Sequence, residues 1–313
     1  MKTVLITGGA GFIGAHTVAF FLQKKWRVIV YDNFSSGQKS RLDLSHPHLK
    51  IVEGDLLDFP LLRETIAECD AVLHLAAIAS VPVSLETPVH TLKTNLLGFV
   101  HILEAIRHAE TPIRLVYASS AAVYGAASQL PCNDEAEMTD KVLSPYALEK
   151  LSNEAYADLY ARTFQVKSLG LRYFNVYGPG QDPKSPYSGV ISRFIEQYQR
   201  GGPITVWGDG KQTRDFIFIK DVVAANLKAI ASDYVGVLNI ATGQAQTLNQ
   251  VIDSLQSMSG KKVPVEYAPK RAGDIYQSYA VVNKAQKAIG FKAETSLLEG
   301  IRELMLSYAD SFP

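Results

Sequence analysis

The opening residues, "TVLITGGAGFIGAHTVAFFL", join a short apolar run to a helical segment through closely spaced glycines. The run at 3–7 predicts a buried strand, and Gly8, Gly11 and Gly14 fall where this strand turns into the helix. Glycine there permits a tight turn, brings backbone N–H groups close to a diphosphate and lets the helix pack on the strand. The helix N-terminus adds partial positive charge. This start therefore predicts a dinucleotide-binding βαβ unit.

Similar apolar runs recur through the first half of the chain and alternate with segments of helical length. The runs are almost continuously apolar, as expected for strands that helices cover on both faces. The expected strands are 3–7, 27–32, 50–55, 71–77, 114–120 and 165–175, and the expected helices are 59–68, 87–109 and 144–162. This alternation predicts an α/β fold with a doubly wound, Rossmann-type parallel sheet.

The pattern changes after about residue 176, where "NVYGPGQDPKSPYSG" reads as a long loop of the kind that builds a binding cleft. Strands are expected in "ITVWGDG" and "RDFIFI", and a helix over 221–230. Thr247 and Gln250 form a capping box for a helix that Gly260 ends. We expect a nucleotide-binding domain at 1–175, with contributions from about 214–240, and a smaller, discontinuous α/β substrate domain at 176–313.

The composition narrows the choice of partners. The 31 basic and 31 acidic side chains among 313 residues cancel, so charge gives no reason to expect nucleic acid or an anionic membrane surface. Cys69 and Cys132 lie far apart, which favours a reducing compartment. No apolar stretch approaches the ~18 residues of a membrane span, and the histidines show no metal-ligand spacing. We expect a soluble, cytoplasmic protein that uses no metal.

Two acids follow the strands at the nucleotide end. Asp32 ends the second strand, 18 residues after Gly14. A carboxylate at this place accepts the ribose hydroxyls of the adenosine and repels a 2′-phosphate, which favours NAD over NADP. Asp55 ends the third strand in the same way and is a candidate contact of the adenine.

The segment "SPYALEK" carries Tyr146 and Lys150 four residues apart, on one face of a helix that Ser144 can cap. An ammonium group near a phenol stabilises the phenolate, so the tyrosine could act as a base near neutral pH. The same spacing also arises by chance on exposed helix surfaces. Its significance rests on the phosphate loop and on the strand that ends in two serines, at 119–120.

Five motifs in this order, "TGGAGFIG", "HLAA", "SSAAVYG", "YALEK" and "RYFNVYGPGQDP", resemble the extended short-chain dehydrogenase/reductase superfamily. Within it the chain is most similar to the UDP-glucose (UDP-N-acetylglucosamine) 4-epimerase type, from Lys2 to about Leu306. The resemblance implies tightly bound NAD, a UDP-sugar substrate bound by 176–313, and a homodimer that pairs through the 87–109 and 144–162 helices.

The resemblance also implies roles for particular residues. Ser120 would hydrogen-bond the 4-oxygen of the sugar, Tyr146 would act as base and acid, and Lys150 would tune it and hold the nicotinamide ribose. The implied cofactor-binding residues are Gly8, Gly11, Phe12, Ile13, Gly14, Asp32, Asn33, Ser36, Gly37, Asp55, Leu56, Ala76, Ala77, Asn95, Ser119, Tyr146, Lys150 and Tyr173. The implied substrate-binding residues are Ser84, Ser120, Tyr146, Asn175, Val190, Thr205, Trp207, Arg214, Arg271, Asp274 and Ser278.

Some of these substrate residues have a physical rationale, and others have an equally good structural explanation. An arginine pair, Arg214 and Arg271, suits a diphosphate through charge-assisted hydrogen bonds, and the Asp274 carboxylate suits ribose hydroxyls. Trp207 could pack near the uracil or simply belong to the core. Ser84 could contact the sugar or lie in a surface loop.

Ala121 and Ala122, directly after the serines, indicate which reaction of the superfamily to expect. Dehydratases and decarboxylases of this superfamily carry acidic residues in this stretch, whereas epimerisation needs one acid/base and room for the sugar to turn. We therefore expect UDP-Glc/UDP-Gal interconversion through a transient 4-keto intermediate. The alternatives are a 4,6-dehydratase, a decarboxylase, a UDP-glucuronate 4-epimerase or, from another class, a non-catalytic NAD-binding regulator. The regulator would not need the three catalytic side chains together.

Ser278, four residues after Asp274, bears on the choice of sugar. In related epimerases this position borders the 2-substituent, and a bulky aromatic side chain there accompanies plain hexoses. A small serine leaves volume for an N-acetyl group, so we expect UDP-GlcNAc/UDP-GalNAc to be accepted as well.

Overall fold

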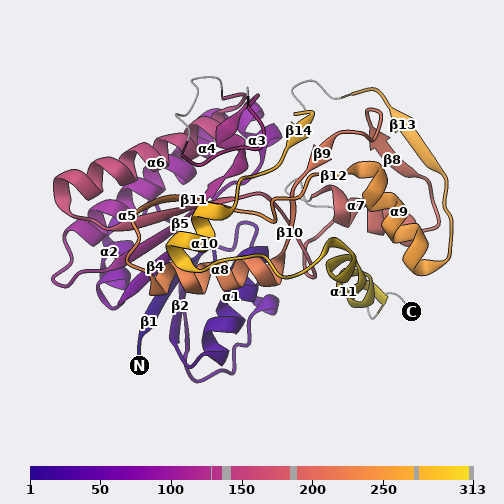
Figure 1. The fold of residues 1–313 in the computed structure, drawn as a ribbon. Coiled ribbons are helices and arrows are strands. Elements are labelled where there is room, and N and C mark those ends of the chain that lie inside the picture. The colour runs from indigo at the N-terminus through magenta and orange to yellow at the C-terminus, as the bar shows by residue number, and fades with distance from the viewer. Residues whose placement is uncertain (128, 136–141, 184–188, 271–274, 310–313) are drawn as a thin grey trace.

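The computed structural model describes residues 1–127, 129–135, 142–183, 189–270 and 275–309. Its centre is a seven-stranded parallel sheet with the order β11-β6-β5-β4-β1-β2-β3 (Figure 1). The strands are β1 (Thr3–Thr7), β2 (Arg27–Asp32), β3 (Leu49–Glu53), β4 (Ala71–His74), β5 (Arg114–Ser120), β6 (Ser168–Tyr173) and β11 (Gly236–Ile240). The predicted α/β class with a Rossmann-type sheet is confirmed.

Helices cover both faces of this sheet (Figure 1). One face carries α1 (Phe12–Gln23), α8 (Ile219–Ala231) and α10 (Asn283–Ile289), and the other carries α2 (Phe59–Ala67), α5 (Gly98–Arg107) and α6 (Pro145–Phe164). Neighbouring strand residues enter opposite cores: Val4 and Ile6 pack with the first group, and Leu5 packs with the second. Because successive side chains of a strand point to opposite faces, both must be apolar, which explains the unbroken apolar runs.

The order of the strands determines where a ligand can enter. From β1 the chain winds outward through β2 and β3, and then returns to place β4 on the other side of β1. The connections leaving β1 and β4 therefore diverge onto opposite sides of the sheet. A crevice opens beyond the carboxyl ends of the strands at such a switch point.

The segment expected as one regular helix at 87–109 differs from that expectation. It consists of α4 (Pro88–Leu92), a π-helical turn η2 (Lys93–Leu97) and α5. Asn95 lies in the π turn and is fully buried. A π turn inserts an extra residue and changes the direction in which the side chains point, so apolar periodicity alone could not predict it.

"RDFIFI" is also not one strand. β9 (Thr213–Arg214) pairs with β12 (Gln246–Thr247) and β14 (Gln277–Ser278), whereas β10 (Phe216–Phe218) pairs with β7 (Asn175–Tyr177). The break falls at Asp215, which is fully buried and accepts hydrogen bonds from the backbone N–H groups of Thr242 and Gly243, both at 2.8 Å. Burial raises the pKa of this carboxyl, and these bonds oppose the effect.

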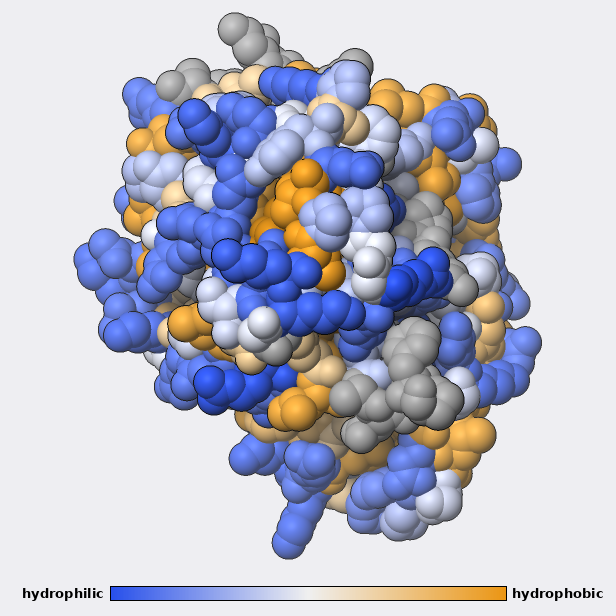
Figure 2. Space-filling view, turned by 90° about the vertical axis from the view of Figure 1, so that its right-hand side faces the viewer, coloured by the Kyte–Doolittle hydropathy of each residue, from blue (hydrophilic) through white to orange (hydrophobic). Residues whose placement is uncertain are grey.

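The C-terminal lobe packs around an apolar core to which α8 also contributes Ile219 and Val223. It contains α7 (Val190–Gln199), β8 (Ile204–Trp207), α9 (Leu248–Ser259), β13 (Val265–Ala268) and α11 (Leu297–Ala309). The predicted capping box of α9 is present, and the helix ends at Gly260 with φ +67°. On this side of the molecule, hydrophilic residues surround an apolar patch near the centre of the view (Figure 2). Within the described ranges, none of the helices combines the length and apolarity needed to cross a bilayer.

A buried ion pair joins α6 to the sheet. The Arg172 guanidinium of β6 donates to both carboxylate oxygens of Glu154, with Nε–Oε1 at 2.8 Å and Nη2–Oε2 at 2.6 Å. The Ser119 hydroxyl of β5 also donates to Glu154 Oε1, at 2.5 Å. The two charged side chains are 3% and 8% exposed, so water hardly screens them. The pair fixes the position of α6 against β5 and β6.

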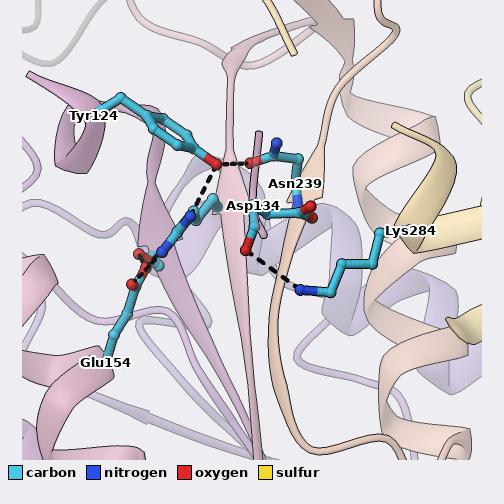
Figure 3. Close-up of polar contacts among 7 residues, drawn as sticks. Tyr124, Asp134, Glu154, Asn239 and Lys284 are labelled. Carbon is cyan, nitrogen blue, oxygen red and sulfur yellow. Dashed lines mark hydrogen bonds and ion pairs between the residues drawn. The ribbon is translucent and has the colours of Figure 1, made fainter. Parts of the chain in front are cut away.

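The network continues toward the last strand of the sheet (Figure 3). Arg172 Nη1 donates to the Tyr124 hydroxyl, which donates to Asn239 Oδ1 of β11 at 2.7 Å. The Asn239 backbone N–H donates to Asp134 Oδ2, and Lys284 Nζ donates to the Asp134 carbonyl. These contacts bind the segment after β5 to strands and loops more than 100 residues away in sequence.

Candidate active site

Two adjoining cavities lie beyond the carboxyl ends of the strands. The glycine-loop cavity, of about 660 Å³, lies beyond β1 to β5. The lobe cavity, of about 820 Å³, lies between this edge of the sheet and the C-terminal lobe. Ser120, Tyr146 and Tyr173 line both, so the two cavities meet at these side chains.

Most of the predicted site residues line one of these cavities. The glycine-loop cavity is lined by Gly8, Gly11, Phe12, Ile13, Gly14, Asp32, Asn33, Ser36, Gly37, Asp55, Leu56, Ala76, Ala77, Ser119, Ser120, Tyr146, Lys150 and Tyr173. The lobe cavity is lined by Ser120, Tyr146, Asn175, Val190, Thr205, Trp207, Arg214 and Ser278. Arg271 and Asp274 lie outside the described residues.

Two predicted contacts are placed differently. Ser84 is fully buried, donates to the Val81 carbonyl at 2.7 Å and lines neither cavity. Asn95 is also fully buried and outside both cavity walls, because its side chain binds Ile78 and Glu149 instead. The donor hydrogens of both side chains are therefore engaged inside the protein. Asn95 acts on the glycine-loop cavity indirectly, through Ile78, which lines it.

The glycine loop has the geometry that a diphosphate requires. Gly8 has φ +67°, which suits a tight turn, and its carbonyl accepts from the Gly11 N–H at 3.0 Å. A Cβ atom on Gly14 would lie 2.1 Å from the Gly8 carbonyl oxygen. A Cβ atom on Gly8 would lie 2.7 Å from the Ala76 backbone. Side chains at these positions would push the loop out of the position in which its N–H groups can face an anion.

The acid at the end of β2 is held in place by the same loop. Asp32 is 8% exposed and accepts from the N–H groups of Ala10 at 2.9 Å and Phe34 at 2.8 Å. Each oxygen keeps a second lone pair, which can accept a ribose hydroxyl. Asn33 donates to Asp55 at 3.0 Å, which brings the second predicted acid to the same end of the cavity. These residues fit an adenosine diphosphate that carries a free 2′-hydroxyl.

The candidate catalytic residues come together from β5 and α6. Ser144 caps α6 by accepting from the Ala147 N–H at 3.2 Å, which places Tyr146 in the first turn, next to Ser120. Lys150, one turn later, is 2% exposed, and its Nζ donates to the Ala118 carbonyl at 2.9 Å. This ammonium group lies 6.0 Å from the centre of the Tyr146 ring.

The electrostatics of this group differ from the expectation in one respect. Burial raises the pKa of the Tyr146 phenol, and a hydrogen bond with Ser120 only partly opposes this. Burial also lowers the pKa of the Lys150 ammonium group to about 8. In the protein alone, therefore, Lys150 does not bring the phenol into the range of a base, because its ammonium group faces a backbone carbonyl. A cation bound in the glycine-loop cavity would oppose the effect of burial on Tyr146.

One charged residue of the lobe cavity, Arg193 of α7, was not among the predicted site residues. It is half-buried, and among the described residues it has no hydrogen-bond or ion-pair partner. The described lining of this cavity contains Arg193 and Arg214 but no Asp, Glu or His. Two arginines in a described lining without an acidic side chain favour an anionic ligand. The sequence could have indicated Arg193, because this residue lies three positions after Val190 on one helix.

Comparison with known proteins agrees with this geometry. Residues 4–241 match the NAD dependent epimerase/dehydratase family. The chain belongs to this family. The expected superfamily, its Rossmann-type fold and NAD as its cofactor are thereby confirmed, and so is the expectation of an enzyme of the epimerase type.

Solved structures of this family superimpose on nearly the whole chain. The UDP-N-acetylglucosamine 4-epimerase of Methanobrevibacter ruminantium M1, in complex with UDP-N-acetylmuramic acid, is 34% identical, with 99% of each chain covered and a TM-score of 0.94. The UDP-glucose 4-epimerase of Thermotoga maritima with UDP-glucose is 34% identical, with 99% of each chain covered and a TM-score of 0.92. The UDP-glucose 4-epimerase of Thermus thermophilus with NAD is 33% identical, covering 99% of this chain and 100% of that one, with a TM-score of 0.89.

The close contact between Gly14 and Gly8 leads to a testable prediction. Gly14→Ala should weaken NAD binding by roughly tenfold or more, because its Cβ atom would displace the backbone that faces the diphosphate. NAD content after purification and titration with NAD of the stripped protein would measure this. Gly202→Ala is the matched control, since a Cβ atom there would meet nothing within 4 Å. Equal NAD affinity of the two variants would contradict the assigned role of the loop.

Proposed function

We propose that this enzyme is a UDP-hexose 4-epimerase, which interconverts UDP-Glc and UDP-Gal and also UDP-GlcNAc and UDP-GalNAc. One observation carries the proposal. Ser120 and Tyr146 stand where the two cavities meet, and no other general acid or base of the Asp, Glu or His type lines the described part of the lobe cavity. Ala121 and Ala122 occupy the adjacent wall. A site with one proton-transfer group suits epimerisation better than elimination.

Each residue of the site has a separate role in this reaction. Bound NAD supplies the redox chemistry, since it can take a hydride from C4 of the sugar and return it to the other face. Tyr146 removes the proton of the 4-hydroxyl and later gives it back, while Ser120 holds the 4-oxygen. Lys150 holds the nicotinamide ribose and keeps a positive charge near the phenol. Arg193 and Arg214 bind the diphosphate, which leaves the 4-keto sugar free to turn about its link to it.

The alternative enzymes need groups that the described walls of the lobe cavity lack. A 4,6-dehydratase or a decarboxylase would need acids near C5 and C6 of the sugar, where alanines stand. A UDP-glucuronate 4-epimerase would need a cation near C6 in addition to those that bind the diphosphate. A non-catalytic regulator would bind NAD without needing Ser120, Tyr146 and Lys150 at one place.

Incubation with UDP-galactose or UDP-GalNAc, without added NAD, should yield the 4-epimers, which chromatography separates. Tyr146→Phe should lower kcat by about 10²–10⁴-fold while NAD remains bound, because the proton-transfer group is lost and the cavity keeps its shape. Loss of water or CO₂ from the substrate would favour a dehydratase or a decarboxylase. Turnover of UDP-glucuronate alone would favour the glucuronate epimerase, and no turnover of any sugar with NAD bound would favour the regulator.

Ser278 supports the inclusion of N-acetylated sugars. It lies on β14, beside Arg214 of β9, and lines the lobe cavity with a small side chain. Ser278→Tyr should abolish turnover of UDP-GalNAc while UDP-galactose is still converted, because the phenol ring would fill the volume for the acetamido group. Ser278→Ala is the control and should convert both. A similar loss of both activities in Ser278→Tyr would contradict this specificity.

We also propose a cytoplasmic homodimer, and α6 supports its interface. This helix buries charged and amide side chains together with Ala157 and Tyr160, whereas its Leu148 and Leu159 are 54% and 43% exposed. The adjacent α4–η2 segment exposes Val89 and Leu92, at 68% and 48%. Exposed apolar side chains that gather on adjacent helices are typical of protein interfaces.

The wild-type protein should have a mass in solution of twice 34.3 kDa, as measured by light scattering or sedimentation. The double variant Leu92→Arg/Leu159→Arg should dissociate into monomers, because two charges per subunit would be buried in the interface. Leu298→Arg, at an exposed leucine of α11, is the control and should leave the dimer intact. A monomeric wild type would contradict the proposal.

A further inference from the structure

The proposed reaction makes no use of Glu149, although this residue lies on α6 between Tyr146 and Lys150. Its carboxylate is 4% exposed. Oε1 accepts from the Thr91 hydroxyl at 2.7 Å, and Oε2 accepts from Asn95 Nδ2 at 2.6 Å. Both oxygens act as acceptors toward neutral donors, as expected of an ionised carboxylate. No salt bridge of Glu149 is found in the described part of the chain, so it is a buried anion without a direct ion-pair partner.

Asn95 connects this anion to the wall of the glycine-loop cavity. Its Oδ1 accepts from the Ile78 N–H at 2.8 Å, and its Nδ2 donates to the Ile78 carbonyl at 3.1 Å as well as to Glu149. Asn153 of α6 holds the Asn95 carbonyl at 3.1 Å. The π turn is what brings Asn95 inward, and π turns occur often at functional sites. Ile78 and its neighbours at 76–79 line the glycine-loop cavity.

Two carboxylates of the same helix, Glu149 and Glu154, carry charges that act on Lys150. Glu149 and Glu154 of α6 both raise the pKa of Lys150 against the effect of burial. Arg172 of β6, however, neutralises Glu154 through the ion pair. His74 of β4 adds no negative charge and is neutral, because burial, with the charge of Lys150 adding to it, lowers its pKa to about 3.

Four further titratable groups of the surrounding elements carry no negative charge. Tyr146 and Tyr124 are phenols whose pKa burial raises, so both are neutral near neutral pH. His90 and Lys93, of the α4–η2 segment, line the glycine-loop cavity and carry no negative charge. Of the two carboxylates that act on Lys150, Glu149 is thus the one that no arginine or lysine side chain pairs directly within the described residues.

We propose that Glu149 is a positioning residue of this active site, which balances the charge of Lys150 and, through Asn95, fixes the 76–79 wall against the cofactor. The proposal rests on the proposed function for its kinetic readout only. A carboxylate is needed for the first role, whereas any side chain that accepts a hydrogen bond from Asn95 can fill the second. The two roles can therefore be separated by substitution.

Glu149→Gln removes the charge and keeps a group that can accept from Asn95. Without the anion, the protonated forms of Lys150 and Tyr146 are less favoured, so the pKa of each should fall. The bell-shaped pH profile of kcat/KM for the NAD-loaded enzyme should shift to lower pH by about one unit, while NAD remains bound. Thr91→Val is the control: it removes one hydrogen bond, keeps the charge and should leave the profile in place.

Glu149→Leu removes both the charge and the bridge. It should show the same shift of the pH profile. In addition, the Kd of NAD should rise roughly tenfold or more, because Asn95 loses the carboxylate that orients its side chain against Ile78. If the leucine variant does not fold, Glu149→Gln still tests the role of the charge.

A second readout does not depend on turnover. Titration of the Lys150 Nζ resonance in ¹⁵N-lysine-labelled holoenzyme should show deprotonation at a pH about one unit lower in Glu149→Gln than in the wild type. If the wild type converts no UDP-sugar, the proposed function fails, and this titration and the Kd of NAD still decide the role of Glu149. Superimposable titrations of wild type and Glu149→Gln would overturn the proposal, as would unchanged NAD affinity in a folded Glu149→Leu.

Discussion

The buried ion pair between Glu154 and Arg172 is the constraint on which the site depends. A charge left alone in the interior costs about 3–5 kcal/mol, so α6 can pack on the sheet only where these two side chains meet. That position brings Ser119 within hydrogen-bond distance of Glu154 and sets Lys150, one turn earlier on α6, against the Ala118 carbonyl. The ion pair thus determines the distance between the catalytic helix and the end of β5. Catalytic geometry here follows from the neutralisation of charge inside the fold.

The same requirement explains how α6 can bury four charged or amide side chains. Its inner face carries Glu149, Lys150, Asn153 and Glu154, each with a hydrogen-bonding partner on another element. Hydrogen bonds and ion pairs thus add to the apolar packing of Ala157 and Tyr160 in holding this helix. Its outer face mixes the exposed Leu148 and Leu159 with the ion pair of Asp158 and Arg162.

Much of the fold follows from local patterns in the sequence. The strands of the sheet, the glycine loop, Asp32 and the caps at Ser144 and Thr247 depend on neighbouring residues and on the repeat of each element, so they could be predicted. Tyr146 and Lys150 could be predicted as a pair because four residues make one helical turn. Their resemblance to a known superfamily then supplied the roles.

The remaining features depend on contacts between distant segments. The break at Asp215 is caused by backbone N–H groups of the loop at 242–243, which no local pattern reveals. Asn95 was expected at the cofactor, but its position in the π turn directs it to Ile78 and Glu149. Arg193 stood out only once the cavity was defined, because its described lining holds no Asp, Glu or His.

The distribution of charge between the two cavities separates their tasks. The glycine-loop cavity places Asp32 and Asp55 at one end, where they can accept ribose hydroxyls, and its phosphate-binding part is made of backbone N–H groups. The described lobe cavity holds two arginines and no acid. A dinucleotide with a free 2′-hydroxyl and a nucleoside diphosphate sugar are thus favoured on opposite sides of one phenol. Because Tyr146 lines both cavities, one phenol can reach a cofactor in the first and a sugar in the second, so proton transfer requires both ligands.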